Sequence, residues 1–180
     1  MSHAPSLSPY LDFASRHGAC WSRAVRASAV VCAAWVRFKC RYGCDYYDQK
    51  RCCPPRTPTP EETAAVVRCY RRAILAVWEA PPGLRERRLA RRRMQQSMRE
   101  LERTLFLDGF YKALAFVAGP CTLCARCDLD EPCKHPGDPR PSMESCGMDV
   151  YATLANAGYR LRVVTDPAQH HHMCGLVLVE

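Results

Sequence analysis

The sequence lacks the long hydrophobic segments that would place the protein in a membrane or direct its export. No run approaches the roughly 18 to 20 apolar residues that a helix needs to span a bilayer. The N-terminal region does not combine a basic start, a long apolar stretch and a small-residue cleavage site, because the best run, residues 24–36, is broken by Arg26. We therefore expect a cytoplasmic protein that does not associate with membranes.

Common catalytic motifs are also missing. The chain contains no Gly-rich phosphate loop, no nucleotide-binding fingerprint and no Ser-His-Asp constellation. The cysteine and histidine pairs that occur are better explained as metal ligands than as a nucleophilic dyad. The sequence therefore identifies no reaction, and whether the protein is an enzyme stays open.

Cysteine, in contrast, is abundant, with 13 residues in a chain of 180. Disulfides are rare in a reducing compartment, where clustered cysteines more often bind metal. Thiolates are soft ligands that select zinc or an iron-sulfur cluster over calcium or magnesium. Five of the cysteines fall within 26 residues: Cys121, Cys124, Cys127, Cys133 and Cys146. This spacing predicts a metal site.

The remaining composition is that of an ordinary globular protein, with 48% hydrophobic and 24% charged residues. The formal net charge is +8, and much of it lies in the arginine-rich segment 85–93. That segment has no interleaved aromatic residues, so it indicates a solvated helix face and makes nucleic acid an unlikely partner. The length suits one metal-binding domain, assigned to residues 35–180, behind an N-terminal lead-in, residues 1–34, that is partly disordered or helical.

Hydrophobic patterns place each cysteine-rich loop after a predicted strand. Alternation over residues 35–39 predicts a strand that leads into Cys40, and the apolar run 113–118 predicts a buried strand that leads into Cys121. Further strands are predicted over residues 72–78, 159–164 and 175–179. We expect an α/β fold, a mixed sheet flanked by helices, with two cysteine-rich metal-binding loops at one edge.

Three helices are also predicted. One begins at Pro60, with Thr59 as the N-cap and Glu62 as the return half of a capping box. The others cover about residues 84–111 and 148–157. One apolar stripe of the second helix has members four, three and four residues apart: Met94, Met98, Leu101 and Leu105. This period predicts that the methionines pack in the core and do not bind metal.

Six short segments occur in a distinctive order: Lys39–Cys44, Cys53–Pro55, Thr57–Glu62, Gly119–Cys124, Cys133–Pro136 and Arg140–Gly147. In these motifs the region from about Trp35 to Glu180 resembles a family of predicted metal-binding proteins, domain-of-unknown-function family 2284 (DUF2284). The resemblance implies metal binding, with an iron-sulfur centre as the expected form, and implies no reaction. The chain departs from the family pattern at Asp48, where a glycine is usual, and at Cys52, which is an extra cysteine.

The resemblance also implies a set of eight cysteine ligands: Cys40, Cys44, Cys53, Cys121, Cys124, Cys127, Cys133 and Cys146. Eight thiolates are what two cubane clusters require, so the leading hypothesis is one or two 4Fe4S clusters, with zinc as the alternative. Two sets are assigned to separate clusters: Cys121, Cys124 and Cys127, and Cys40, Cys44 and Cys53. Cys133 and Cys146 complete these sets in an order that the sequence does not determine.

Groups beside the ligands are expected to tune the site. His135, next to Cys133 in the chain, is expected to contact a ligand from outside, and Lys134 and Arg140 to add positive charge. Further cations lie near the proposed ligands: Lys39, Arg41 and Arg51. Such cations raise the reduction potential of an anionic cluster.

Cysteines without a matching motif are predicted to pack in the interior: Cys20, Cys32, Cys52, Cys69 and Cys174. Cys52 is the exception, because it could replace Cys53 as a ligand. The histidine tract at residues 170–172 is predicted to be a surface loop.

Three functions remain open at this point. The first is an iron-sulfur protein that transfers electrons to or from a protein partner, or supports that partner's redox state. The second is a structural zinc module that shapes an interaction surface. The third is an enzyme whose cluster has only three thiolates and binds substrate at the fourth iron. The sequence does not indicate the oligomeric state.

Overall fold

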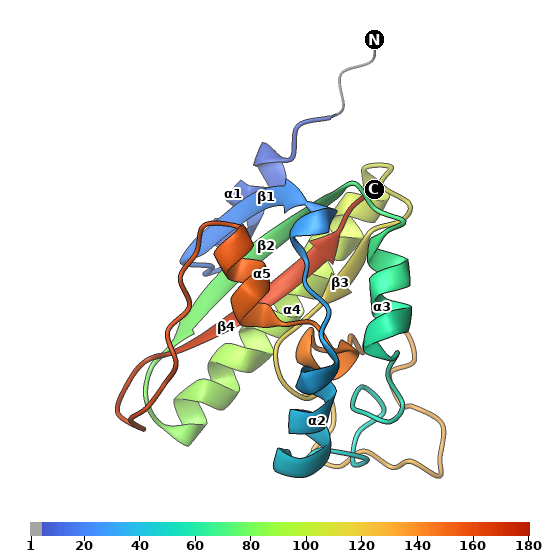
Figure 1. Cartoon of the computed structure of the whole chain (residues 1–180), viewed down its shortest axis with the longest axis vertical. Helices are drawn as coiled ribbons and strands as arrows, with labels where there is room; N and C mark the ends of the chain where they lie inside the picture. Colours follow the sequence, from blue (N-terminus) through green and yellow to red (C-terminus); the bar gives the residue numbers. More distant parts are fainter. Residues whose placement is uncertain (1–4) are drawn as a thin grey trace.

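A four-stranded antiparallel sheet forms the centre of the protein in the computed structural model, which describes residues 5–180 (Figure 1). Its strands, in the spatial order β1-β2-β4-β3, are β1 (Trp21–Arg26), β2 (Arg72–Ala80), β4 (His171–Leu178) and β3 (Leu114–Phe116). All three strand pairings are antiparallel. With helices on both faces, the predicted α/β class is confirmed, but the sheet is antiparallel and not mixed.

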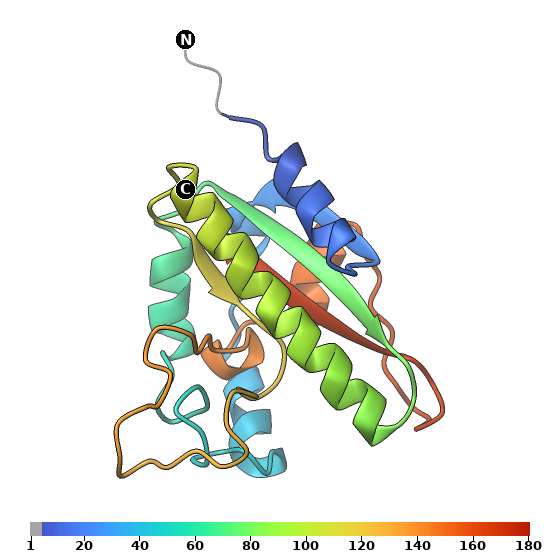
Figure 2. The same ribbon diagram turned by 180° about the vertical axis from the view of Figure 1, so that it is seen from behind.

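One face of the sheet is covered by α4 (Leu84–Leu107) and, beside it, α1 (Ser8–Arg16), as Figure 2 shows. The predicted stripe of α4 is confirmed as core, because all four of its members are fully buried: Met94, Met98, Leu101 and Leu105. The helix passes close to β4 at Gly175, where an added Cβ would lie 2.7 Å from the Met98 sulfur. This close contact fixes α4 against the sheet.

The opposite face carries α5 (Val150–Asn156), while α3 (Pro60–Val67) lies beside the β3 edge (Figure 1). The predicted capping box of α3 is confirmed: the Glu62 backbone N–H donates to Thr59 Oγ1, and the Thr59 N–H donates to Glu62 Oε2. Residues of β2 alternate between the two faces, so both faces of the central strands are buried.

The two cysteine-rich loops meet beyond one end of the sheet. The first contains the end of α2 (Ala34–Gly43) and residues 44–59, and the second covers residues 119–141. Figures 1 and 2 both place these segments side by side below the sheet, although they are about seventy residues apart in sequence. The predicted pairing of two cysteine-rich loops is confirmed, and the loops lie beyond one end of the sheet.

The predicted strand over residues 35–39 is wrong, because these residues belong to α2. Pairs four residues apart stabilise the helix: the Phe38 and Tyr42 rings lie 5.9 Å apart, and the Lys39 ammonium lies 5.4 Å from the Trp35 ring. The apolar alternation did not mark a buried sheet face.

The predicted strand over residues 159–164 is also wrong, since that segment has no regular structure. The free sides of the sheet are those of the edge strands β1 and β3, and the segment 159–164 pairs with neither. Tyr159 and Leu161 still pack on the core cluster of the α5 face. The strand predicted over 175–179 begins earlier than expected, at His171, so the histidine tract is only partly a surface loop.

The segment proposed as a lead-in, residues 1–34, contains α1 and the edge strand β1. Tyr10 and Ala14 of α1 are buried in the core between α4 and the sheet. Residues 1–4 of this segment lie outside the described residues, and the boundary at residue 34 stays a prediction. Within residues 5–180, no helix combines the length and the apolar character that crossing a membrane requires.

Candidate metal centre

The first cysteine group consists of Cys40, Cys44 and Cys53. Cys40 lies on the last turns of α2, Cys44 caps the end of that helix, and Cys53 follows in the next turn of the chain. Burial raises the pKa of Cys53 to about 12, and the neighbouring Cys44 and Cys40 thiols add to this shift. Thiols that crowd together resist simultaneous ionisation unless a cation compensates their charge. A metal ion or cluster would provide that compensation.

Arg37 holds α2 in the position that forms this group. Its Nη1 donates to Thr57 Oγ1 at 2.8 Å, to the Pro58 carbonyl at 2.9 Å and to the Ser145 carbonyl at 2.7 Å. The Thr57 hydroxyl also donates to the Ser145 carbonyl, at 2.6 Å. One guanidinium thus joins α2, the first loop and the 3-10 turn at Glu144–Cys146.

The second cysteine group consists of five residues that line one small, mostly apolar cavity: Cys52, Cys121, Cys124, Cys127 and Cys133. Four of these come from the second loop, and Cys52 comes from the first. His135 also lines the cavity, where the sequence predicted a group beside the ligands.

The two groups adjoin at the consecutive residues Cys52 and Cys53. Cys44 and Cys40 act most strongly on Cys53, with a smaller contribution from Cys121, whereas the Cys52 thiol interacts most strongly with Cys121 and lies near Cys53 and Cys127. The interaction with the Cys52 thiol lowers the pKa of Cys121 to about 6, and it raises the pKa of Cys52. This interaction favours the thiolate form of Cys121, which is the form that binds metal.

Lys50 lies between the two groups and was not anticipated from the sequence. It is only 9% exposed, and its Nζ donates to the Cys124 carbonyl at 3.4 Å. Its positive charge lowers the pKa of both Cys53 and Cys121. A buried ammonium in this position favours thiolates in both groups at once.

Gln95 of α4 fixes the start of the second loop. This buried side chain donates from Nε2 to the carbonyls of Ala118, at 3.0 Å, and Pro120, at 2.9 Å, and its Oε1 accepts from the Thr122 hydroxyl at 2.8 Å. The sequence contains no signal for this role, because Gln95 lies within an otherwise ordinary helical pattern.

Two arginines secure the rest of the second loop. Arg51 donates from the first loop to the carbonyls of Asp128, at 3.3 Å, and Leu129, at 3.0 Å. Arg140 pairs with Glu102 of α4 at 2.5 Å. Arg140, expected beside the ligands, thus anchors the loop to the helix.

Cys146 lies apart from the second group, in the 3-10 turn that packs against α2, where the Cys40 thiol lies 3.9 Å from the Glu144 carbonyl oxygen. It is fully buried in the core cluster of the α5 face and does not line the cavity of the second group. Burial raises its pKa to about 11, and Ser145, Arg37 and Cys32 lie around the thiol. The nearby Glu144 has a buried Oε2 with no hydrogen-bond partner among residues 5–180.

Of the other cations and cysteines considered in the sequence, some are buried and others are exposed. Lys134 is exposed, and Lys39 and Arg41 lie over the rings of aromatic neighbours on α2. Cys174 is buried, as predicted, but the interior packing predicted for Cys20 and Cys69 is wrong because both are exposed. Both lie in short connections beside a strand or helix end, where the chain reaches solvent.

The donor atoms suit a thiophilic metal, since sulfur predominates in both groups and positive charge surrounds them. In the described part of the chain, no three His, Cys, Asp or Glu side chains are already arranged around a single ion. The cysteines therefore gather as two groups rather than as a finished coordination shell. The Cys121–Cys127 run has the spacing that places three sulfurs around one cubane.

Comparison with known proteins gives one result. No curated protein and no solved structure matches the chain. The model of the family described as "Predicted metal-binding protein (DUF2284)" matches residues 23–179, which include both cysteine groups and the sheet that positions them. The chain belongs to this family of predicted metal-binding proteins.

Proposed function

We propose that the protein binds one or two 4Fe4S clusters through its cysteine groups and transfers electrons to or from a partner protein, or supports that partner's redox state. The observation that carries this proposal is the convergence of two cysteine loops, about seventy residues apart in sequence, beyond one end of the sheet. A bound cluster would supply a site that accepts and releases single electrons. Free thiols persist in reducing compartments, which supports a cytoplasmic location.

The residues of the chain have separable roles in this proposal. The Cys121–Cys127 run holds one cluster, with a fourth sulfur taken from the same cavity, and Cys40, Cys44 and Cys53 hold the other. Lys50 offsets the negative charge of both sets of thiolates. The apolar cavity wall limits the access of water, which stabilises an iron-sulfur cluster against hydrolysis.

A spectrum with a metal assay tests the proposal. Anaerobically prepared protein is expected to be brown, to contain iron and acid-labile sulfide, and to lose its broad visible absorption on reduction. Colourless protein with stoichiometric zinc and no sulfide would contradict it and support the structural zinc module instead.

A second candidate, an enzyme with an open iron site, is favoured by one feature. The first group brings together only three sulfurs, while Cys146 lies in the core. A cluster with three thiolates leaves one iron free for substrate. Added cyanide would then alter the electron paramagnetic resonance signal of that cluster alone, and an unchanged signal would exclude the open site.

The proposed partner carries an acidic surface. Five arginines follow one face of α4, at positions three, four, seven and four residues apart: Arg85, Arg88, Arg92, Arg99 and Arg103. Within residues 5–180, none of them pairs with a carboxylate. Arg99 lies close enough to lower the pKa of Cys121, so this basic face borders the second group. Complementary charge would bring a partner to that border.

Charge reversal tests the partner surface. We expect Arg92→Glu to slow electron transfer to an acidic acceptor protein, with the difference from wild type shrinking as salt increases. Arg162→Glu makes the same charge change at an exposed site outside α4 and is the matched control. Equal slowing by both substitutions would mean that the face has no special role.

A further inference from the structure

The extra cysteine of this chain, Cys52, belongs spatially to the second cysteine group and not to the group of its neighbour Cys53. Its thiol interacts with Cys121 and lines the same cavity as Cys124 and Cys127. Consecutive side chains of an irregular turn can point in different directions, and here they point into different groups.

The turn that carries Cys52 is tied to the second loop by the two residues that precede Cys52. Before it, Lys50 donates to the carbonyl of Cys124. Next to it, Arg51 donates to the carbonyls of Asp128 and Leu129. These bonds hold Cys52 against the second loop, because both of its anchored neighbours attach to that loop.

We propose that Cys52 is the fourth thiolate ligand of the metal centre held by Cys121, Cys124 and Cys127. The inference rests on the proposed metal-binding function and names a ligand of that centre. When the metal binds, the S–H bond of Cys52 breaks, its proton passes to solvent, and a sulfur–metal bond forms without a change in oxidation state. The Cys52–Cys53 peptide then connects the two metal centres directly.

Cys133 is the competing fourth ligand, because it lines the same cavity. Its surroundings differ from those of Cys52, since residues 131, 132 and 134 are all exposed. The two residues before Cys52 donate to the Cys124 and Leu129 carbonyls of the loop that carries the other three sulfurs, whereas Arg51 reaches the Cys133 segment only at the Glu131 carbonyl. The better-fixed thiol is the one already directed at Cys121.

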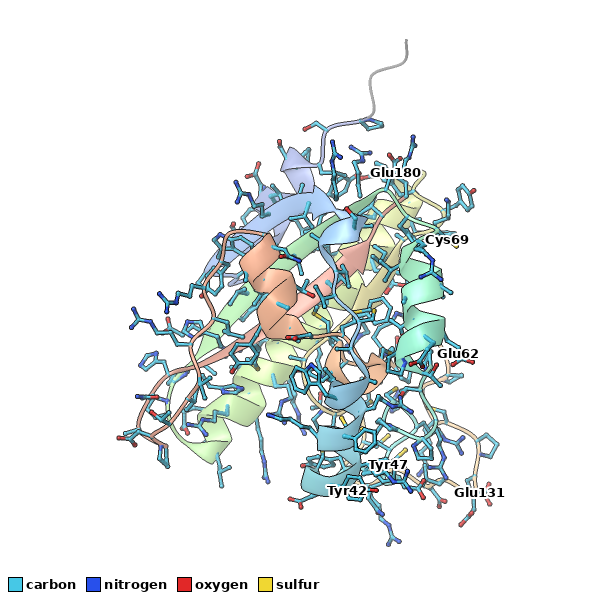
Figure 3. All side chains as sticks on the ribbon, viewed as in Figure 1. Tyr42, Tyr47, Glu62, Cys69, Glu131 and Glu180 are labelled. Carbon is cyan, nitrogen blue, oxygen red and sulfur yellow. The ribbon has the colours of Figure 1, made fainter. Side chains whose placement is uncertain are left out.

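Protection from alkylation tests this assignment on the unaltered protein. Metal-loaded and metal-free protein are treated with iodoacetamide, and fragment ions of the tryptic peptides assign each label to Cys52 or Cys53. We expect Cys52 to be protected when metal is bound and labelled after its removal. Exposed Cys69 should be labelled in both states; it lies at the end of α3 farther from the cysteine loops (Figure 3). Labelling of Cys52 in the loaded protein to the extent of Cys69 would overturn the inference.

Three serine variants provide a second measurement. Cys52→Ser is expected to lose the metal of one centre, whereas Cys69→Ser keeps the wild-type content. Full metal content in Cys52→Ser with loss in Cys133→Ser would make Cys133 the fourth ligand and overturn the inference. A wild-type protein that binds no metal would overturn the proposed function as well, so the two failures are distinguishable.

Discussion

The two cysteine groups differ in how many sulfurs they gather and in how their charge is balanced. The first brings together three cysteines around the end of a helix, where burial and mutual crowding raise the pKa of Cys53 to about 12. The second lines a cavity with five cysteines, and there the pKa of Cys121 is lowered to about 6. Burial and neighbouring thiols keep Cys53 protonated in the first group, whereas in the second group Cys52 keeps its proton and its thiol lowers the pKa of Cys121. Only the second group therefore holds a thiol whose ionisation is favoured before metal binds.

The two cysteine groups also differ in the contacts that hold them in place. The first group depends on a helix whose position is set by one guanidinium, that of Arg37. The second depends on a long irregular loop held at several points by Gln95, Arg51 and Arg140. Irregular segments need such side-chain anchors, because they lack the repeated backbone hydrogen bonds of a helix or strand. Loss of one anchor should therefore affect the two groups unequally.

The largest expected effect is the loss of one metal centre when a ligand is removed. Cys124→Ser should abolish binding at the second group and leave the first intact, and Cys44→Ser should do the reverse. Each variant is expected to retain about half of the bound metal, because each cubane takes its own set of thiolates. Metal and sulfide analysis of the purified variants measures this.

The matched control for both is Cys69→Ser, which alters an exposed thiol remote from the loops (Figure 3). If either ligand variant lost all of its metal, the two groups would form one centre rather than two. The two groups would then have no separate metal-binding properties.

Arg37→Ala should have the next largest effect, this time on stability. It removes the donor for the Pro58 and Ser145 carbonyls and for Thr57 Oγ1. The Ser145 carbonyl keeps its bond from the Thr57 hydroxyl, and the loss of the remaining bonds should cost about 2 kcal/mol of the free energy of unfolding. Urea unfolding of the metal-free protein measures the change.

Arg41→Ala is the control for this substitution, because Arg41 is exposed on the same helix and lies over the Tyr42 ring. Its loss should change the free energy of unfolding by less than about 0.5 kcal/mol. Equal effects of the two substitutions would mean that the Arg37 hydrogen bonds do not hold α2 in place.

Most of the fold could be predicted from the sequence, at segments where the local residue pattern matches the burial found in the structure. The stripe through Met94 and Met98 predicted α4, and Thr59 with Glu62 predicted the start of α3, because both signals depend on residues close in the chain. The two wrong strands failed for tertiary reasons. Residues 35–39 are helical despite their alternation, and the segment 159–164 packs Tyr159 and Leu161 on the core without pairing with an edge strand.

The sequence predicted which residues form the candidate site, but not how they are arranged. Motif spacing identified the cysteines, but not that Cys52 and Cys53 point into different groups or that Cys146 lies in the core. Lys50 and Gln95 had no signal at all, since their roles arise from contacts with residues tens of positions away. Such contacts depend on how the two loops meet, which no local pattern encodes.

Gln95→Ala tests whether the second cysteine group is held in place independently of the first. The substitution leaves the Ala118 and Pro120 carbonyls without their donor and should lower the free energy of unfolding by about 1 to 2 kcal/mol. It should also make the thiols of the second loop react faster with alkylating reagents, while Cys44 reacts at its wild-type rate. Gln96→Ala, at the exposed neighbouring position, serves as the control. Faster alkylation of Cys44 as well would show that the two groups share one support.

The smallest expected effect concerns the charge that the two groups have in common. Lys50→Met keeps much of the side-chain volume but removes the ammonium that lowers the pKa of Cys121 and Cys53. Both thiols should then ionise less readily, and about 1 kcal/mol corresponds to roughly a fivefold slower alkylation wherever the thiol is mostly protonated, at neutral pH for Cys53 and at about pH 5 for Cys121, in the metal-free protein. Lys39→Met, which removes a cation that lies over the Trp35 ring, should leave both rates unchanged. Slowing of Cys121 alone would mean that Lys50 acts on the second group only, and the charge balance of the two groups would then be independent.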